Sequence, residues 1–243
     1  MMMARDRILL AFAWTVHLYT ALGAVAGLFA LNCIADREWR AAFAAMGVAI
    51  AIDATDGTLA RALRVRDRIP QFDGALLDNV VDYLTYVGAP ALLMLRASIL
   101  PRGPIGFAIA AGVMVASGYG FCRVDAKTPD HYFRGFPSYW NIVALYLFCL
   151  GLAPALNGVI VAVLAVMVFV PIDYIYPSRT TAMRPLTLTL AAIWAIATAV
   201  LVATLPAFSR VALYTSLAFV VYYFVMSFVL YADPARRAAH RRP

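Results

Sequence analysis

Long apolar stretches, separated by short polar and basic segments, follow one another along the whole chain. About 20 consecutive apolar residues are enough for a helix to cross a bilayer. On that rule the sequence predicts eight membrane-spanning helices, joined by connections too short to hold a soluble domain. Their predicted ranges are 8–34, 40–62, 72–96, 104–123, 139–156, 158–176, 185–205 and 210–231. The expected fold is an all-α integral membrane bundle that forms a single domain over residues 1–243.

The composition agrees with lipid as the main solvent of this chain. Of its 243 residues, 64% are hydrophobic and 14% are charged, whereas a soluble domain is about half apolar and about a quarter charged. The cysteines are isolated from one another, which indicates single buried thiols rather than a disulfide framework or a zinc site. The basic residues lie at the ends of the apolar runs instead of in one patch, so we expect no nucleic-acid partner despite the net charge of +7.

The basic residues also predict an orientation. An even number of spans places both termini on one side of the membrane. Fifteen of the 20 Lys and Arg residues lie at the helix ends on that side, and five lie at the opposite ends. The positive-inside rule therefore predicts that both termini are cytoplasmic. The first apolar run is too long for a signal-peptide core, so we interpret it as a retained first span.

The second and third apolar runs contain acidic residues in a regular pattern. Each set falls on one helical stripe, because its members are spaced by three or four residues. A charge at the centre of a bilayer costs at least about 2.5–3.5 kcal/mol, so these acids need partners. The two stripes consist of Asp53, Asp56, Gly57, Ala60 and Arg61 in the second run, and of Gly74, Asp78 and Asp82 in the third.

The connection between these two runs is short and basic, so the acids of both runs lie at similar depth and can face each other. Four converging carboxylates repel one another, and a divalent cation such as Mg²⁺ or Mn²⁺ removes that conflict. Two other interpretations remain: a proton or ion relay in a transporter, and a salt-bridge cluster with Arg61. The broken helices and inverted repeats typical of transporters are not evident in the sequence.

The pattern D-x-x-D-G-x-x-A-R, followed by G-x-x-x-D-x-x-x-D, resembles the signature of the CDP-alcohol phosphotransferase family at every fixed position. The spacer between its two halves, Ala62 to Asp73, has twelve residues and is longer than usual. In this the chain is similar to the family's bacterial phosphatidylcholine synthase branch. Segments 14–21 and 126–141 resemble the same branch.

This resemblance implies an enzyme that transfers the phosphatidyl group of CDP-diacylglycerol to choline and releases CMP. It implies that one or two Mn²⁺ or Mg²⁺ ions are held by Asp53, Asp56 and Asp78, with Asp82 as a further ligand and as the catalytic base. The implied location is the bacterial inner membrane, with the active site facing the cytoplasm, and family members are commonly homodimers. The alternatives are another acceptor (serine, inositol or glycerol phosphate) or, in a different class, a cation- or proton-coupled transporter.

The remaining candidate residues concern the two substrates. A quaternary ammonium group is usually bound by aromatic faces, often with a carboxylate nearby. The residues expected to contact CDP-diacylglycerol are Gly57, Ala60, Arg61, Gly74, Thr20 and Arg179, and those expected to contact choline are Tyr86, Tyr119, Tyr132, Tyr139 and Trp140. We interpret His17 as a packing residue and expect Asp173 to form a local ion pair with Arg179.

Overall fold

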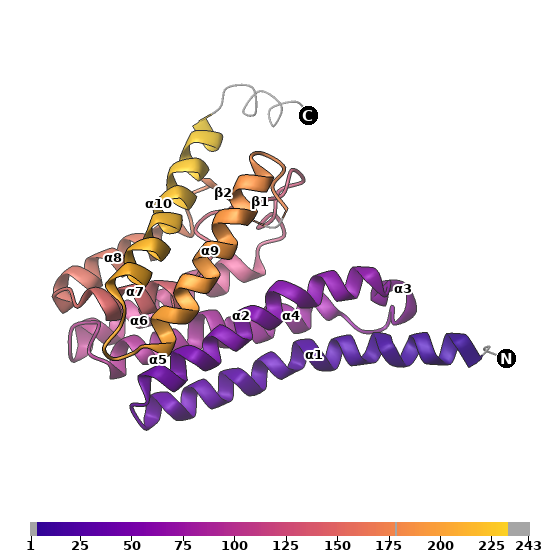
Figure 1. Cartoon of the computed structure of the whole chain (residues 1–243), viewed down its shortest axis with the longest axis horizontal. Coiled ribbons are helices and arrows are strands. Elements are labelled where there is room, and N and C mark those ends of the chain that lie inside the picture. Colours follow the sequence, from indigo (N-terminus) through magenta and orange to yellow (C-terminus); the bar gives the residue numbers. More distant parts are fainter. Residues whose placement is uncertain (1–3, 178, 233–243) are drawn as a thin grey trace.

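The structure is a computed structural model that describes residues 4–177 and 179–232. Figure 1 shows long helices packed against one another, with the α9–α10 pair and the α1–α2 pair on different sides of the bundle. The elements in chain order are α1 (Ala4–Ala35), α2 (Trp39–Ala62), α3 (Val65–Arg68), α4 (Gly74–Asp82), the π-helix η1 (Tyr83–Gly88), α5 (Ala89–Arg96), α6 (Pro104–Cys122), β1 (Tyr132–Arg134), α7 (Trp140–Leu150), α8 (Pro154–Met167), β2 (Asp173–Ile175), α9 (Arg184–Ala203) and α10 (Arg210–Ala232).

Within the described residues, five helices are long and apolar enough to cross a membrane, namely α1, α2, α6, α9 and α10. They begin and end within a few residues of the predicted runs, which supports an integral membrane protein. The elements α4, η1 and α5 follow one another without a break over residues 74–96 and match a sixth predicted run. The total of eight spans is not confirmed, and neither is the orientation of the termini, whose last residues lie outside the described ranges.

The predicted runs 139–156 and 158–176 are wrong in their boundaries. Helix α7 has 11 residues and α8 has 14, so they are about 16 Å and 21 Å long, against a hydrocarbon core of about 30 Å. Helix α7 ends because Gly151 takes a left-handed conformation with a φ of 58°, and Pro154 then starts α8. Beyond α8, the chain forms a strand where a helix was predicted.

A two-stranded antiparallel sheet was not predicted. Its register pairs Tyr132 with Ile175 and Arg134 with Asp173. The backbone N–H of Ile175 also donates to Ser227 Oγ of α10 at 3.0 Å. The sheet therefore connects the segment after α6 and the segment before α9 to the side of the bundle.

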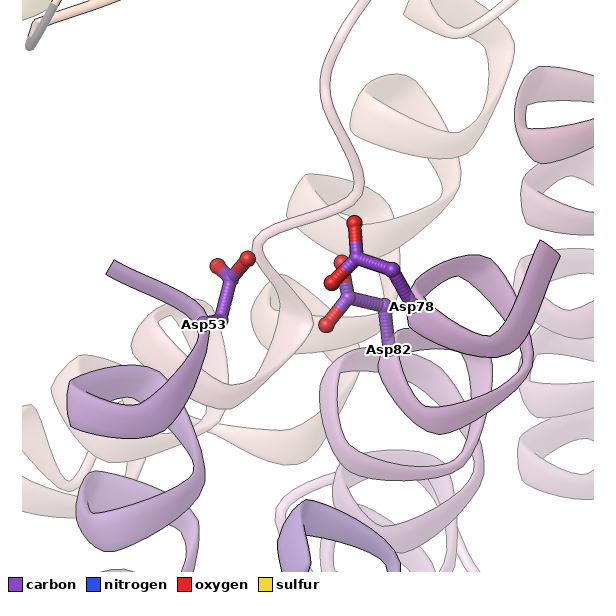
Figure 2. A group of neighbouring side chains, drawn as sticks. All are labelled: Asp53, Asp78 and Asp82. Atoms are coloured by element: carbon purple, nitrogen blue, oxygen red, sulfur yellow. The ribbon is translucent and has the colours of Figure 1, made fainter. Parts of the chain in front are cut away.

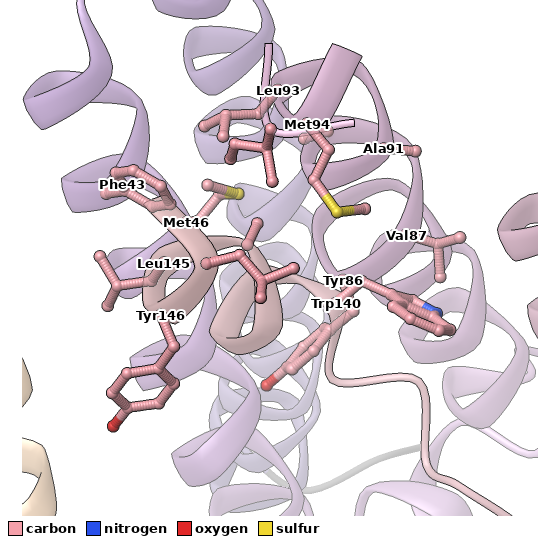
Figure 3. Close-up of a cluster of buried hydrophobic side chains, with 14 of the residues drawn as sticks. Phe43, Met46, Tyr86, Val87, Ala91, Leu93, Met94, Trp140, Leu145 and Tyr146 are labelled. Atoms are coloured by element: carbon pink, nitrogen blue, oxygen red, sulfur yellow. The ribbon is translucent and has the colours of Figure 1, made fainter. Parts of the chain in front are cut away.

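The interior and the outer surface of the bundle are both apolar. In the interior, side chains of α2, α5 and α7 meet, among them Met46, Met94 and Trp140 (Figure 3). The outward faces of α1, α6, α9 and α10 expose many large apolar side chains, such as Leu28 and Val115. A helix that is apolar on all sides is typical of a membrane span, so these outward faces suit contact with lipid chains.

Candidate active site

Helix α4 places two acids at defined positions. The Asp73 side chain accepts hydrogen bonds from the backbone N–H groups of Ala75 and Leu76, both at 3.0 Å. This is the N-cap arrangement that satisfies the free donors of a first turn, and it explains why α4 begins at Gly74. Asp78 and Asp82 then follow one turn apart on one face of α4.

Three carboxylates from α2 and α4 point toward one another. Asp53, Asp78 and Asp82 each offer an oxygen atom, and these oxygens lie within 4.8 Å of one another (Figure 2). Two ligand oxygens on opposite sides of a Mg²⁺ ion are about 4.2 Å apart, because each lies about 2.1 Å from the metal. A small side-chain adjustment would close that difference. The donor set, all carboxylate oxygen, therefore fits a hard divalent cation.

The surroundings of the three acids leave their negative charge poorly compensated. The Tyr86 hydroxyl donates to Asp53 Oδ2 at 2.8 Å, whereas among the described residues no side chain donates a hydrogen bond to Asp78 or Asp82. The positive charge of Lys127 acts on all three carboxylates. One lysine cannot balance three acids, so the cluster favours a bound cation.

Tyr86 belongs to the π-helix η1, which begins directly after Asp82. Short π-helical segments often occur at functional sites, because the wider turn changes the direction of a few side chains. Tyr86 was predicted to contact choline, and the structure places its hydroxyl on Asp53 of α2. Tyr86 therefore connects the two acid-bearing helices.

Asp56 does not join this group. Only 6% of its surface is exposed, and its Oδ2 accepts a hydrogen bond of 2.7 Å from Thr20 Oγ1 of α1. The structure thus brings together three of the four predicted acids. Thr20, which was expected to contact CDP-diacylglycerol, is a direct partner of the fourth.

We expect Thr20→Val to lower the free energy of unfolding by about 1–3 kcal/mol. The buried Asp56 carboxylate would lose its hydrogen-bond donor, while the volume of the side chain at position 20 stays nearly constant. Thermal unfolding of the purified protein in detergent measures this effect. Thr15→Val is the matched control, since Thr15 is exposed on the same helix and bonds only to the backbone of Phe12. Equal unfolding temperatures for the two variants would contradict the prediction.

A cavity of about 940 Å³ reaches Asp53, one of the three acids, and extends between α2, α7, α9 and α10. Six of the predicted site residues line it: Asp53, Gly57, Arg61, Tyr86, Tyr139 and Arg179. The rest of its wall is largely apolar and includes Ile142, Leu147, Leu188 and Val220. A cavity with charged groups in one part and apolar side chains in the other suits an amphiphilic ligand.

Several predicted contact residues do not line this cavity. The indole N–H of Trp140 donates to Ser117 Oγ at 2.8 Å in the interior. Tyr132 is buried in β1, and Tyr119 is 47% exposed, with its ring 4.9 Å from that of Phe169. The structure therefore gives no support to these three aromatic residues as choline contacts.

Ala60 and Gly74 also lie elsewhere. Ala60 packs against a small cluster that includes Val65 and Ile69. A Cβ atom on Gly74 would lie 2.7 Å from Cε1 of His17, so Gly74 is required for the close approach of α4 to that ring. This agrees with His17 as a packing residue.

Sequence reasoning missed other cavity residues, namely His131, Tyr176, Arg184 and Tyr223. They come from three chain segments remote from the acidic motif, so no spacing pattern connects them with it. The interpretation of Asp173 was also wrong. It lies in β2, where its Oδ1 is 3.5 Å from Nε of Arg134 rather than paired with Arg179.

Charged side chains fix the segment that follows α6. Arg123 donates two hydrogen bonds of 2.8 Å to Asp125, and Arg134 donates a third at 3.1 Å. These bonds hold the pKa of the Asp125 carboxyl well below its usual range, with Arg123 as the main cause. The segment that contains Lys127 is thus anchored on both sides.

The family model for CDP-alcohol phosphatidyltransferase matches residues 7–172. A phosphatidylcholine synthase of Pseudomonas aeruginosa is 39% identical over 197 residues, which cover 81% of this chain and 82% of that protein. A second from Legionella pneumophila is 43% identical over 168 residues, which cover 69% of this chain and 66% of that protein. A third from Legionella bozemanae is 47% identical over 154 residues, covering 63% and 70% respectively.

The match to the family model includes the whole acidic motif, and three of the motif's four acids meet in space. The chain therefore belongs to the CDP-alcohol phosphatidyltransferase family.

Proposed function

We propose that this chain is a phosphatidylcholine synthase, which transfers the phosphatidyl group of CDP-diacylglycerol to choline and releases CMP. The observation that carries the proposal is the group of carboxylates from Asp53, Asp78 and Asp82, which adjoins a cavity for an amphiphile. The relatives named phosphatidylcholine synthase support choline as the acceptor.

Asp53, Asp78 and Asp82 would hold one or two Mn²⁺ or Mg²⁺ ions. Asp56, which the sequence predicts as a further ligand, lies outside this group in the structure and bonds to Thr20. Such ions neutralise the charge of a pyrophosphate and stabilise the charge that develops on a leaving phosphate oxygen. The protein's own contribution is to place these acids on α2 and α4, which both pack against α1, so that the substrate pyrophosphate meets a fixed set of charges.

Asp82 is the proposed general base. Its carboxylate takes the proton from the choline hydroxyl as the choline oxygen forms a bond to the phosphorus that carries diacylglycerol. The bond from that phosphorus to the bridging oxygen of the pyrophosphate breaks, and the electron pair leaves with CMP. A hydroxyl group needs a base at this distance because its own pKa is far above neutral.

The cavity supplies groups for the rest of CDP-diacylglycerol. Arg61, Arg179 and Arg184 line it and suit phosphate oxygens, because a planar guanidinium can donate two parallel hydrogen bonds. Gly57 faces the same space without a side chain, so a phosphate group can approach the backbone of α2 there. The apolar part between α7, α9 and α10 suits acyl chains.

The proposed placement is the bacterial inner membrane, with both termini and the acids on the cytoplasmic side. The basic residues around the acid-bearing helix ends support this orientation. Association into a homodimer stays a prediction. The exposed apolar helix faces suit lipid contact as well as a second subunit.

The test is the activity of the purified full chain with CDP-diacylglycerol, Mn²⁺ and labelled acceptors. We expect labelled phosphatidylcholine from choline, and no product from serine, inositol or glycerol 3-phosphate. Turnover with one of the other acceptors instead would contradict choline as the substrate. Absence of any turnover in folded protein, together with cation flux in vesicles, would favour a transporter.

A further inference from the structure

The acceptor in the proposed reaction, on which this inference rests, makes an unusual demand on its binding site. The quaternary ammonium of choline has no N–H group, so it cannot donate hydrogen bonds. Aromatic faces bind such cations through the ring quadrupole when the charge lies within about 6 Å of the ring centre. A site for choline should therefore combine several aromatic rings with a nearby negative charge.

Three tyrosines from remote segments meet at the wall of the cavity. Tyr139 precedes α7, Tyr176 follows β2 and Tyr223 lies in α10, and all three line the same space as Asp53. The rings of Tyr139 and Tyr223 are 6.3 Å apart, with 63° between their planes. Rings at such an angle form two walls of a corner rather than a flat stack.

Phe133 of β1 supports this arrangement. Its ring stacks on Tyr176 at 4.5 Å, and it meets Tyr139 nearly at a right angle, at 6.3 Å. The β1–β2 sheet thus holds Tyr176 beside Tyr139. Tyr223 is held from the other side, because its ring lies parallel to Tyr174 of β2 at 6.2 Å.

The same corner adjoins the acids. The ring of Tyr86, whose hydroxyl donates to Asp53, lies 6.0 Å from the ring of Tyr139. Asp53 in turn belongs to the same group of carboxylates as Asp82, the proposed base. In choline only two carbons separate the ammonium from the hydroxyl. An ammonium bound at Tyr139 would therefore leave the hydroxyl within reach of the proposed base.

Tyr223 gives an independent indication of a ligand. Only 7% of its surface is exposed, and its hydroxyl is buried without a hydrogen-bond partner among the described residues. An unpaired buried hydroxyl is uncommon and calls for a reason. Tyr223 is positioned for its ring, which helps to line the cavity, rather than for a hydrogen bond of its hydroxyl.

The cavity's arginines do not face Tyr139 or Tyr223. Arg61 is eight residues after Asp53, which is about 12 Å along α2, and Arg179 lies over the Tyr176 ring, 5.8 Å from its centre. Arg61 and Arg179 therefore suit the phosphates of the other substrate, and the corner of Tyr139 and Tyr223 next to Asp53 suits a cation. We infer that Tyr139 and Tyr223, with Asp53 beside them, form the binding site for the quaternary ammonium of the acceptor.

The experiment compares steady-state kinetics of Tyr139→Leu and Tyr223→Leu with those of wild type. We expect the KM for choline to rise about tenfold in each variant, because each loses one aromatic face that binds the cation. The KM for CDP-diacylglycerol should stay within twofold to threefold of wild type, because the lost contact is made only to choline. Tyr139→Phe and Tyr223→Phe keep their rings and should change the KM for choline by less than about fivefold. The matched control is Tyr214→Leu, on the same helix as Tyr223 but 64% exposed.

A neutral analogue separates charge recognition from simple apolar contact. The analogue is 3,3-dimethylbutan-1-ol, which has the shape of choline without its charge. In wild type its inhibition constant should be far above the KM for choline. The ratio of these two constants should fall in the Leu variants. Unchanged choline KM values in variants that keep their CDP-diacylglycerol KM would overturn the tyrosine site alone. Failure of the wild type to use choline at all would instead overturn the proposed function.

Discussion

Asp82→Asn is expected to reduce phosphatidyl transfer by about 10²- to 10⁴-fold, which is the usual contribution of a positioned general base. The substitution keeps the shape of the side chain and removes its capacity to take the choline proton. Initial rates of labelled phosphatidylcholine formation at saturating CDP-diacylglycerol and Mn²⁺ measure this loss.

Two comparisons separate a lost base from a damaged fold. With both proteins in EDTA, the unfolding temperature of Asp82→Asn should be at least as high as that of wild type. The substitution removes one of three like charges that lie close together. Asp67→Asn in the short helix α3 is the matched control, since Asp67 is exposed and does not belong to the group of three acids. Near-normal turnover by Asp82→Asn would contradict the assignment of the base.

Mn²⁺ is expected to raise the unfolding temperature of the wild-type protein by about 5–10 °C at a concentration 100 times its dissociation constant. Binding to the folded state alone contributes about 2.7 kcal/mol under that condition, and about 2–4 °C correspond to each kcal/mol for a chain of this length. The physical reason is that the cation relieves the repulsion among Asp53, Asp78 and Asp82. Differential scanning fluorimetry in detergent, with and without EDTA, measures the shift.

In Asp78→Asn the Mn²⁺-dependent shift should fall to less than half, because one of the ligand oxygens loses its charge. Phosphatidyl transfer should be lost in EDTA and restored by excess Mn²⁺ in wild type, and restored only weakly in this variant. An equal shift in Asp78→Asn and wild type would show that the stabilising metal binds elsewhere.

The acidic motif could be predicted from the sequence because its spacing is local. Asp78 and Asp82 are one helical turn apart on α4, and Asp53 lies on α2. Only residues 63–73 connect these two helices, so the acids on either side of that connection were expected to lie at similar depth. The exclusion of Asp56 from the group could not be predicted, because it depends on a hydrogen bond to Thr20, which is 36 residues away.

The long helices were also predictable, because a run of about 20 apolar residues indicates a helix that crosses the lipid bilayer. The short helices α7 and α8 were not, because Gly151 and Pro154 divide an apolar segment that hydropathy alone treats as continuous. The strands β1 and β2 pair residues about 40 positions apart and have only three residues each. Such short, remote pairings leave no periodic signal in the chain.

The aromatic residues around the proposed acceptor site could also be predicted only in part. Tyr86 and Tyr139 could be proposed because they lie near the acids or in the segment that follows α6. Tyr176 and Tyr223 could not, because only the sheet and the packing of α10 bring them to the cavity. Trp140 directly follows Tyr139 but points into the interior, where Ser117 binds its indole.

The most direct test is to locate Mn²⁺ in the full chain, crystallised in lipid under conditions where it transfers phosphatidyl groups, by anomalous X-ray scattering. The account predicts an anomalous peak between the carboxylates of Asp53, Asp78 and Asp82. Active protein with its Mn²⁺ at another position, and with these three side chains free of metal, would contradict the account.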